Sequence, residues 1–191
     1  MTVHDYSRYL TPQTLAEEEA AWERQGDQPM HAQLVTAALP HPSATVVEWG
    51  CGTGRLAAKL PAEVVYHGVD ANPLCLALAR ERRPSGIFHP CDLRGAAGLV
   101  QDADLICAFA VFKHFAWEEW PWLCLQFLSV APRAIFSQAI GPLEDTGDSF
   151  VHQFVPLTTV FAVIQAAGHR ILDAAPQHPG DPEWIFQTEI P

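Results

Sequence analysis

Two patterns of hydrophobic and polar residues alternate along this chain. Short runs of apolar and β-branched residues predict strands. These runs lie near residues 44–49, 64–69, 86–89, 103–109, 133–138, 169–174 and 184–190. The segments between them carry apolar residues three or four positions apart, which predicts helices. Such an alternation is typical of βα units on a mainly parallel sheet.

Proline and glycine mark the ends of the predicted helices. Pro73 occupies a favourable first-turn position for a helix over Pro73–Arg82. Pro121 restricts the helix of the 117–128 region to a start close before it, because proline disrupts a helix interior. Other helices are expected over residues 30–39, Arg55–Leu60, Gly95–Gln101 and 157–167.

Three segments lack either periodicity. Residues 1–29 are polar and acidic, which predicts a mobile lead-in with one helix. The stretch GPLEDTGDSF predicts a surface loop, and PQHPGDP predicts a connection wide enough for an antiparallel return. The expected fold class is therefore α/β, a three-layer α/β/α sandwich. Its seven-stranded sheet is mainly parallel and ends in an antiparallel hairpin strand.

Composition narrows the classes of function. A chain of 191 residues favours a single domain, and a net charge of −11 repels phosphate backbones and anionic lipid headgroups. We therefore expect no nucleic-acid partner and no membrane partner. The five cysteines include no CxxC pair, and the nine histidines form no ligand-spaced cluster with them. These features favour a cytoplasmic protein without a metal site, of undetermined oligomeric state.

Three glycines at alternate positions follow the first predicted strand, in the stretch VVEWGCGTGR. Glycine allows a sharp turn and the close approach of another molecule to the backbone. A phosphate-binding loop requires GxxxxGK(S/T), and no lysine follows here. A dinucleotide-binding turn requires GxGxxG, whereas the third glycine of this chain comes one position early. The spacing disfavours a nicotinamide-dependent dehydrogenase, and a tight turn without a ligand is the plain alternative.

The order Glu48-x-Gly50-x-Gly52-x-Gly54 resembles the first motif of the class I S-adenosylmethionine-dependent methyltransferases. Asp70 ends the second strand, where that family keeps an acid that accepts hydrogen bonds from both ribose hydroxyls. Asp92 follows the third strand, where the family commonly contacts the adenine amino group. The fourth strand, in ADLICAFAVFKHF, matches the segment that flanks the methionine part. The resemblance covers about residues 44–115.

The resemblance implies a Rossmann-like core over 44–191 in a single domain of 1–191, with residues 1–43 as a helical lead-in and lid. It also implies S-adenosylmethionine as cofactor and S-adenosylhomocysteine as product. The cofactor-binding residues it implies are Glu48, Trp49, Gly50, Cys51, Gly52, Gly54, Asp70, Ala71, Asp92, Leu93 and Phe109. The plain alternatives are a helix cap for Asp70, a turn or cap for Asp92, and a solvated strand-end acid for Glu48.

His114 is the candidate proton acceptor, since imidazole titrates near neutrality and this residue follows the fourth strand. A passive pocket wall and a helix cap are its alternatives, and His152 is a second candidate. The nearby aromatic residues belong either to the core or to an acceptor pocket, with 142–156 and Tyr6 or Tyr9 as a lid. These residues are Phe109, Phe112, Phe115, Trp117, Trp120 and Trp122.

The expected reaction is methyl transfer to a small-molecule acceptor. DNA base-amino methyltransferases usually carry an Asn/Asp-Pro-Pro-aromatic segment after the fourth strand, and this chain has Phe109-Ala110-Val111-Phe112 there. The alternative is a catalytically silent protein that binds S-adenosylmethionine and regulates a partner.

Overall fold

A seven-stranded sheet forms the centre of the computed structural model, which describes residues 11–25, 28–141 and 154–191. The strand order is β3-β2-β1-β4-β5-β7-β6. The strands are β1 (Thr45–Trp49), β2 (Val65–Asp70), β3 (Ile87–Pro90), β4 (Leu105–Ala108), β5 (Arg133–Ala139), β6 (Arg170–Pro176) and β7 (Glu183–Glu189). β1 to β5 pair in parallel, and β7 runs antiparallel between β5 and β6. The predicted fold class and all seven strands are confirmed.

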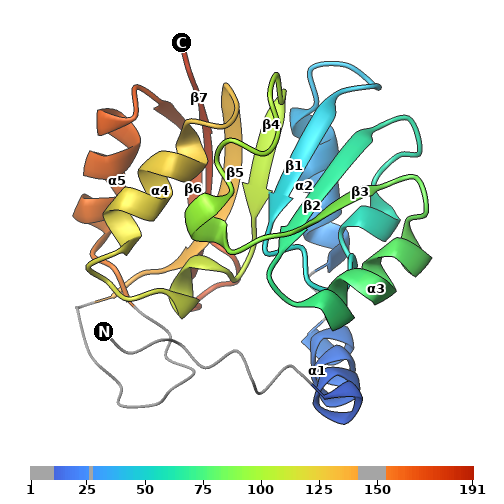
Figure 1. The fold of residues 1–191 in the computed structure, drawn as a ribbon. Coiled ribbons are helices and arrows are strands. Elements are labelled where there is room, and N and C mark those ends of the chain that lie inside the picture. The colour runs from blue at the N-terminus through green and yellow to red at the C-terminus, as the bar shows by residue number, and fades with distance from the viewer. Residues whose placement is uncertain (1–10, 26–27, 142–153) are drawn as a thin grey trace.

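Helices cover the two faces of the sheet (Figure 1). Helices α2 (Gln28–Ala38) and α3 (Pro73–Arg82) pack on one face, and α4 (Trp120–Leu128) and α5 (Leu157–Ala166) on the other. Successive strand residues point to opposite faces of the sheet. Val46 therefore belongs to the core under α2 and α3, and Val47 to the core under α4 and α5. A further helix, α1 (Pro12–Gln25), projects beyond this body next to α3 (Figure 1).

The helix start signals in the sequence are confirmed. The Asn72 side chain accepts hydrogen bonds from the backbone N–H groups of Leu74 and Cys75, and Pro73 occupies the first turn of α3. Pro121 likewise lies in the first turn of α4, which begins at Trp120. The PQHPGDP segment connects the antiparallel strands β6 and β7.

The helix predicted over Arg55–Leu60 is wrong, because only a single 3₁₀ turn, η2 (Ala57–Lys59), forms there. The reason lies in Arg83, whose buried guanidinium donates to four carbonyls, two within this segment and two directly after it. They belong to Ala57 (2.7 Å), Leu60 (3.1 Å), Pro61 (2.9 Å) and Val64 (2.9 Å). Buried carbonyls need partners, and here a side chain supplies them in place of helical N–H groups.

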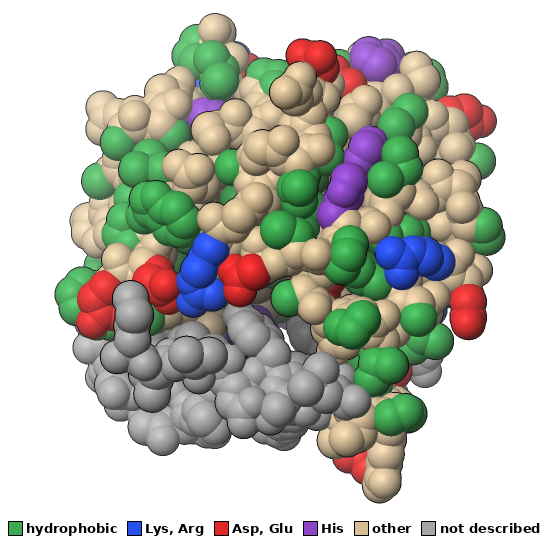
Figure 2. Space-filling view, in the orientation of Figure 1, with side chains coloured by type: hydrophobic (Ala, Val, Ile, Leu, Met, Phe, Trp, Pro, Cys, Tyr) green, Lys and Arg blue, Asp and Glu red, His purple; other side chains and the backbone are tan. Residues whose placement is uncertain are grey.

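The helix predicted over Gly95–Gln101 is also wrong. A 3₁₀ turn, η3 (Leu93–Gly95), is followed by turns, since Gly95 and Gly98 each cost about 1 kcal/mol in a helix. The sheet face over β2 and β3 therefore lacks a covering helix. Val65 and Ile87 remain 44% and 48% exposed there, and Figure 2 shows hydrophobic and histidine side chains gathered on this side.

Parts of the predicted lid lie outside the described residues. Tyr6, Tyr9, His152 and most of the GPLEDTGDSF loop lie outside the residues that the structure describes. In the part of the chain that the structure describes, no helix combines the length and the apolar character that a bilayer crossing requires.

Candidate cofactor and active site

The glycine turn after β1 is held by backbone hydrogen bonds to the end of β2. The N–H groups of Gly50 and Cys51 both donate to the carbonyl of Val69, at 2.8 and 3.1 Å. Gly52 has φ +50°, and a Cβ added to it would meet nothing within 4 Å. The turn therefore presents bare backbone to open space at Gly52, which is what a closely bound ligand requires.

Asp70 ends β2 directly beside this turn. One carboxylate oxygen accepts the Gly52 N–H at 2.9 Å, and the other accepts the Asn72 N–H at 2.8 Å. Burial raises the pKa of Asp70, and the two N–H groups counteract this rise by stabilising the ionised form. Each oxygen keeps a lone pair for a further donor. Asp70 is thus a fixed acceptor pair next to exposed backbone.

Glu48 lies on β1 and is buried, with only 6% of its surface exposed. The Tyr66 hydroxyl donates a hydrogen bond to its carboxylate. Burial raises the pKa of Glu48 to about 8, because the Tyr66 hydrogen bond offsets only part of the desolvation. At neutral pH, Glu48 therefore mostly carries a proton until a cation comes close.

Helix α1 reaches the glycine turn through Glu19. The Glu19 carboxylate accepts a hydrogen bond from the Thr53 hydroxyl and forms ion pairs with Arg55 and Arg82. The Arg82 guanidinium also donates to the Thr53 hydroxyl at 2.6 Å and to the Thr53 carbonyl at 3.1 Å. Together with buried Leu15, this network joins α1 to the turn and to α3.

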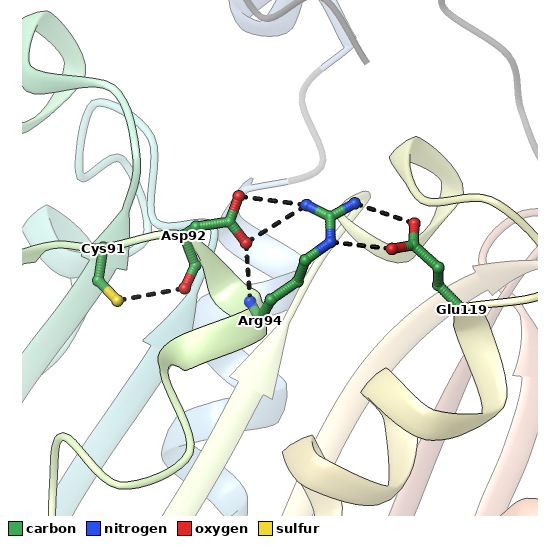
Figure 3. Close-up of polar contacts among 4 residues, drawn as sticks. All are labelled: Cys91, Asp92, Arg94 and Glu119. Carbon is green, nitrogen blue, oxygen red and sulfur yellow. Dashed lines mark hydrogen bonds and ion pairs between the residues drawn. The ribbon is translucent and has the colours of Figure 1, made fainter. Parts of the chain in front are cut away.

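Asp92 caps η3 and is held by a charged chain across the surface (Figure 3). Arg94 lies between Asp92 and Glu119, with its Nη1 3.2 Å from the first carboxylate and its Nη2 2.9 Å from the second. Its guanidinium also lies over the Phe115 ring, 5.0 Å from the centroid. Asp92 therefore caps a turn, and its carboxylate is oriented by Arg94. Glu119, just before α4, pairs with the same arginine.

The end of β4 supplies the aromatic side of the site. Phe109 stacks on His31 of α2, with ring centroids 4.0 Å apart and an interplanar angle of 10°. The next residue, Ala110, has φ +57°, a strained backbone that its N–H to Ser137 Oγ hydrogen bond (2.7 Å) helps to hold. His114 is the last residue of the following 3₁₀ turn, η4 (Phe112–His114), and is half-buried.

These groups surround one cavity of about 260 Å³. The predicted site residues that line it are Glu48, Gly50, Cys51, Gly52, Asp70, Ala71, Asp92, Leu93, Phe109 and His114. Two others do not. The Trp49 side chain points to the opposite sheet face, where it packs against Phe127 of α4. Gly54 instead allows α3 to pack closely, because a Cβ there would lie 2.9 Å from the backbone of Ala79.

The aromatic residues after β4 divide between core, surface and cavity. Phe112 and Trp120 are fully buried in the core, where Trp120 Nε1 donates to Gln138 at 2.7 Å. Trp117 and Trp122 are about half exposed, at 50% and 47%. Of the six residues considered from sequence, Phe109 and Phe115 line the cavity.

Several lining residues were missed from sequence: Leu15, Glu19, His31, Thr53, Arg55, Leu56, Asn72 and Cys75. Thr53 and Arg55 lie within the glycine motif itself, and Asn72 is a recognisable helix cap, so their positions were available as signals. Glu19 and His31 carried no such signal. They reach the site only because α1 contacts the glycine turn and α3 through Glu19, and α2 packs on the sheet.

Comparisons with known proteins agree with this geometry. The methyltransferase domain family model matches residues 46–131. The trans-aconitate 2-methyltransferase of Variovorax paradoxus is 39% identical over 87 residues, which are 43% of this chain and 33% of that protein. The match thus spans about a third of the length of this curated relative.

Several solved structures of similar fold are methyltransferases by name. The magnesium protoporphyrin IX methyltransferase of Synechocystis, with S-adenosylmethionine bound, has a TM-score of 0.71 and 19% identity, covering 88% of this chain and 80% of that one. A TehB-like methyltransferase of Corynebacterium glutamicum has a TM-score of 0.64 and 19% identity, covering 92% and 99%. The glycine motif, the strand order and the family match therefore agree. The chain is similar to methyltransferase domains over residues 46–131 and has the Rossmann-like fold of S-adenosylmethionine-dependent methyltransferases.

Proposed function

We propose that this chain transfers a methyl group from S-adenosylmethionine to a small-molecule acceptor. The observation that carries the proposal is the cavity of about 260 Å³ between bare backbone at Gly52, the fixed carboxylate of Asp70 and the aromatic end of β4. In open α/β sheets, ligands bind at the carboxyl ends of the strands, next to the switch in strand order. β1 lies at this switch, between β2 and β4.

The residues present fit this cofactor. The open space at Gly52 allows the cofactor to approach the protein backbone closely. The remaining lone pairs of Asp70 can accept hydrogen bonds from two ribose hydroxyls. The lining carries four acidic side chains, those of Glu19, Glu48, Asp70 and Asp92, and Glu48 can ionise when a cation binds beside it. Such a lining suits a ligand whose sulfonium and ammonium groups are both cationic.

The bound cofactor would supply an electrophilic methyl group on a positively charged sulfur. The residues of the chain contribute position and surroundings. Phe109, Val111 and Phe115 form an apolar wall that excludes water, and the stacked His31 ring supports Phe109. His114, on the same wall, is the proposed proton acceptor for an acceptor group that must lose a proton.

A small acceptor is favoured over a nucleic acid by the net charge of −11 and by the absence of proline in residues 109–112. The name of the trans-aconitate 2-methyltransferase gives a small molecule as its acceptor, which supports a small-molecule acceptor here. All five cysteines are free thiols, which supports a reducing cytoplasm as the place of the reaction. The silent-binding alternative is not favoured, because the similar proteins with assigned activities are methyltransferases.

Transfer of label tests the activity. Purified protein is incubated with S-adenosylmethionine carrying a labelled methyl group and with a panel of metabolites that includes small carboxylic acids and phenols. We expect label in at least one acceptor, and none with the Asp70→Ala variant. Binding of S-adenosylhomocysteine without transfer to any acceptor would favour the silent-binding alternative.

Cofactor binding should release a proton from Glu48. Its pKa of about 8 in the free protein means that it is mostly protonated at pH 7, and a nearby ammonium group would lower this pKa. Affinity for S-adenosylhomocysteine should therefore rise as the pH increases from about 6 to 8. Calorimetry at pH 7 in phosphate and in Tris measures the released proton through the difference in heat. The Glu48→Gln variant should show no such release, and equal heats for the wild-type protein would contradict the role of Glu48.

A further inference from the structure

The charges that line the cavity are unequal in number and kind. Among the described lining residues are four acidic side chains, of which Glu48 is mostly protonated in the free protein, and a single Lys or Arg side chain, that of Arg55. The amino-acid end of S-adenosylmethionine carries one carboxylate as well as its ammonium group. The ionised acidic residues attract the ammonium group and repel the carboxylate. The carboxylate therefore needs a cationic partner, and Arg55 is the candidate.

Arg55 is placed and oriented for an anion. It follows the glycine turn directly, its side chain is 21% exposed, and its Nη1 lies 3.2 Å from a Glu19 oxygen. Burial lowers the pKa of Arg55, and the neighbouring Glu19 carboxylate opposes this. A partly buried guanidinium requires an anionic partner, and its planar fork can hold two carboxylates at once.

Glu19 does not depend on Arg55 alone. Its second oxygen pairs with Arg82, and the Thr53 hydroxyl donates to its first. Arg82 does not line the cavity. Glu19 therefore stays compensated when the Arg55 guanidinium also serves a ligand, and it fixes the guanidinium at the rim of the glycine turn.

We propose that Arg55 binds the α-carboxylate of the cofactor and that Glu19 of α1 positions its guanidinium for this contact. The inference rests on the proposed function. It makes Arg55 the residue that distinguishes the cofactor from an analogue without the α-carboxylate. In this arrangement α1 contributes to cofactor selectivity, although its residues precede the sheet in the chain.

The test compares S-adenosylhomocysteine with its decarboxylated analogue, which keeps the amine and loses only the carboxylate. Wild-type protein should bind the complete molecule about 10- to 100-fold more tightly, as expected for a charge-assisted hydrogen bond. Arg55→Gln should remove this preference by weakening the complete molecule, while binding of the analogue stays within about threefold. Arg55→Lys should keep part of the preference, because it retains the charge without the fork.

Arg80→Gln is the matched control, since Arg80 is an exposed arginine of α3 that does not line the cavity. It should change neither affinity. Equal losses for both ligands in Arg55→Gln would assign Arg55 a structural role and overturn the inference, as would an unchanged preference. A wild-type protein that binds neither ligand would instead contradict the proposed function itself.

Discussion

Replacing Asp70 with alanine is expected to weaken S-adenosylhomocysteine binding at least about 100-fold. In the proposed complex, the variant removes two acceptors for ribose hydroxyls, each a hydrogen bond to a charged group worth about 1.5–3 kcal/mol. It also removes the carboxylate that holds the Gly52 N–H at 2.9 Å and the Asn72 N–H at 2.8 Å. Calorimetric titration of the variant measures the loss.

Two controls separate binding from folding in this experiment. Asp173→Ala removes an exposed carboxylate on β6, far from the cavity lining, and should leave the affinity unchanged. The free energy of unfolding of Asp70→Ala shows how much of the effect is loss of structure. An affinity within threefold of the wild-type value would exclude Asp70 from the site.

Arg83→Met is expected to lower the free energy of unfolding by about 3–5 kcal/mol. The arginine is 6% exposed and donates to the carbonyls of Ala57, Leu60, Pro61 and Val64. Methionine fills similar space but leaves those carbonyls without a donor. Urea denaturation measures the difference.

Arg80→Met is the matched control for stability. Arg80 also belongs to α3, but it is exposed and donates one hydrogen bond, to the Phe88 carbonyl at 3.2 Å. Its loss should cost about 1 kcal/mol or less. Similar losses in the two variants would contradict the special role of Arg83 as the partner of the 57–64 segment.

Local patterns were sufficient for the sheet and insufficient for two helices. The strands are continuous apolar runs, such as the buried Leu105–Ala108, and their alternation with helical segments predicts parallel pairing. The sequence predicts a helix over Arg55–Leu60, but the carbonyls of Ala57 and Leu60 accept from Arg83, more than 20 residues later in the chain. No pattern within the segment itself reveals such a partner.

The site divides in the same way. Glu48, the glycine turn and Asp70 could be predicted because each lies at the end of a recognisable strand and the parallel sheet brings those ends together. Trp49 shares the motif but points to the other face, as alternation along a strand requires. Glu19 joins Thr53 across 34 residues and Arg82 across 63, so only the folded chain shows that α1 completes the site.

Cofactor choice depends on how the 50–54 backbone and Asp70 are arranged. The most direct measurement is calorimetric titration of the wild-type protein, separately, with S-adenosylhomocysteine and with NAD. We expect saturable one-to-one binding of S-adenosylhomocysteine and no binding of NAD. Binding of NAD without binding of S-adenosylhomocysteine would contradict this expectation.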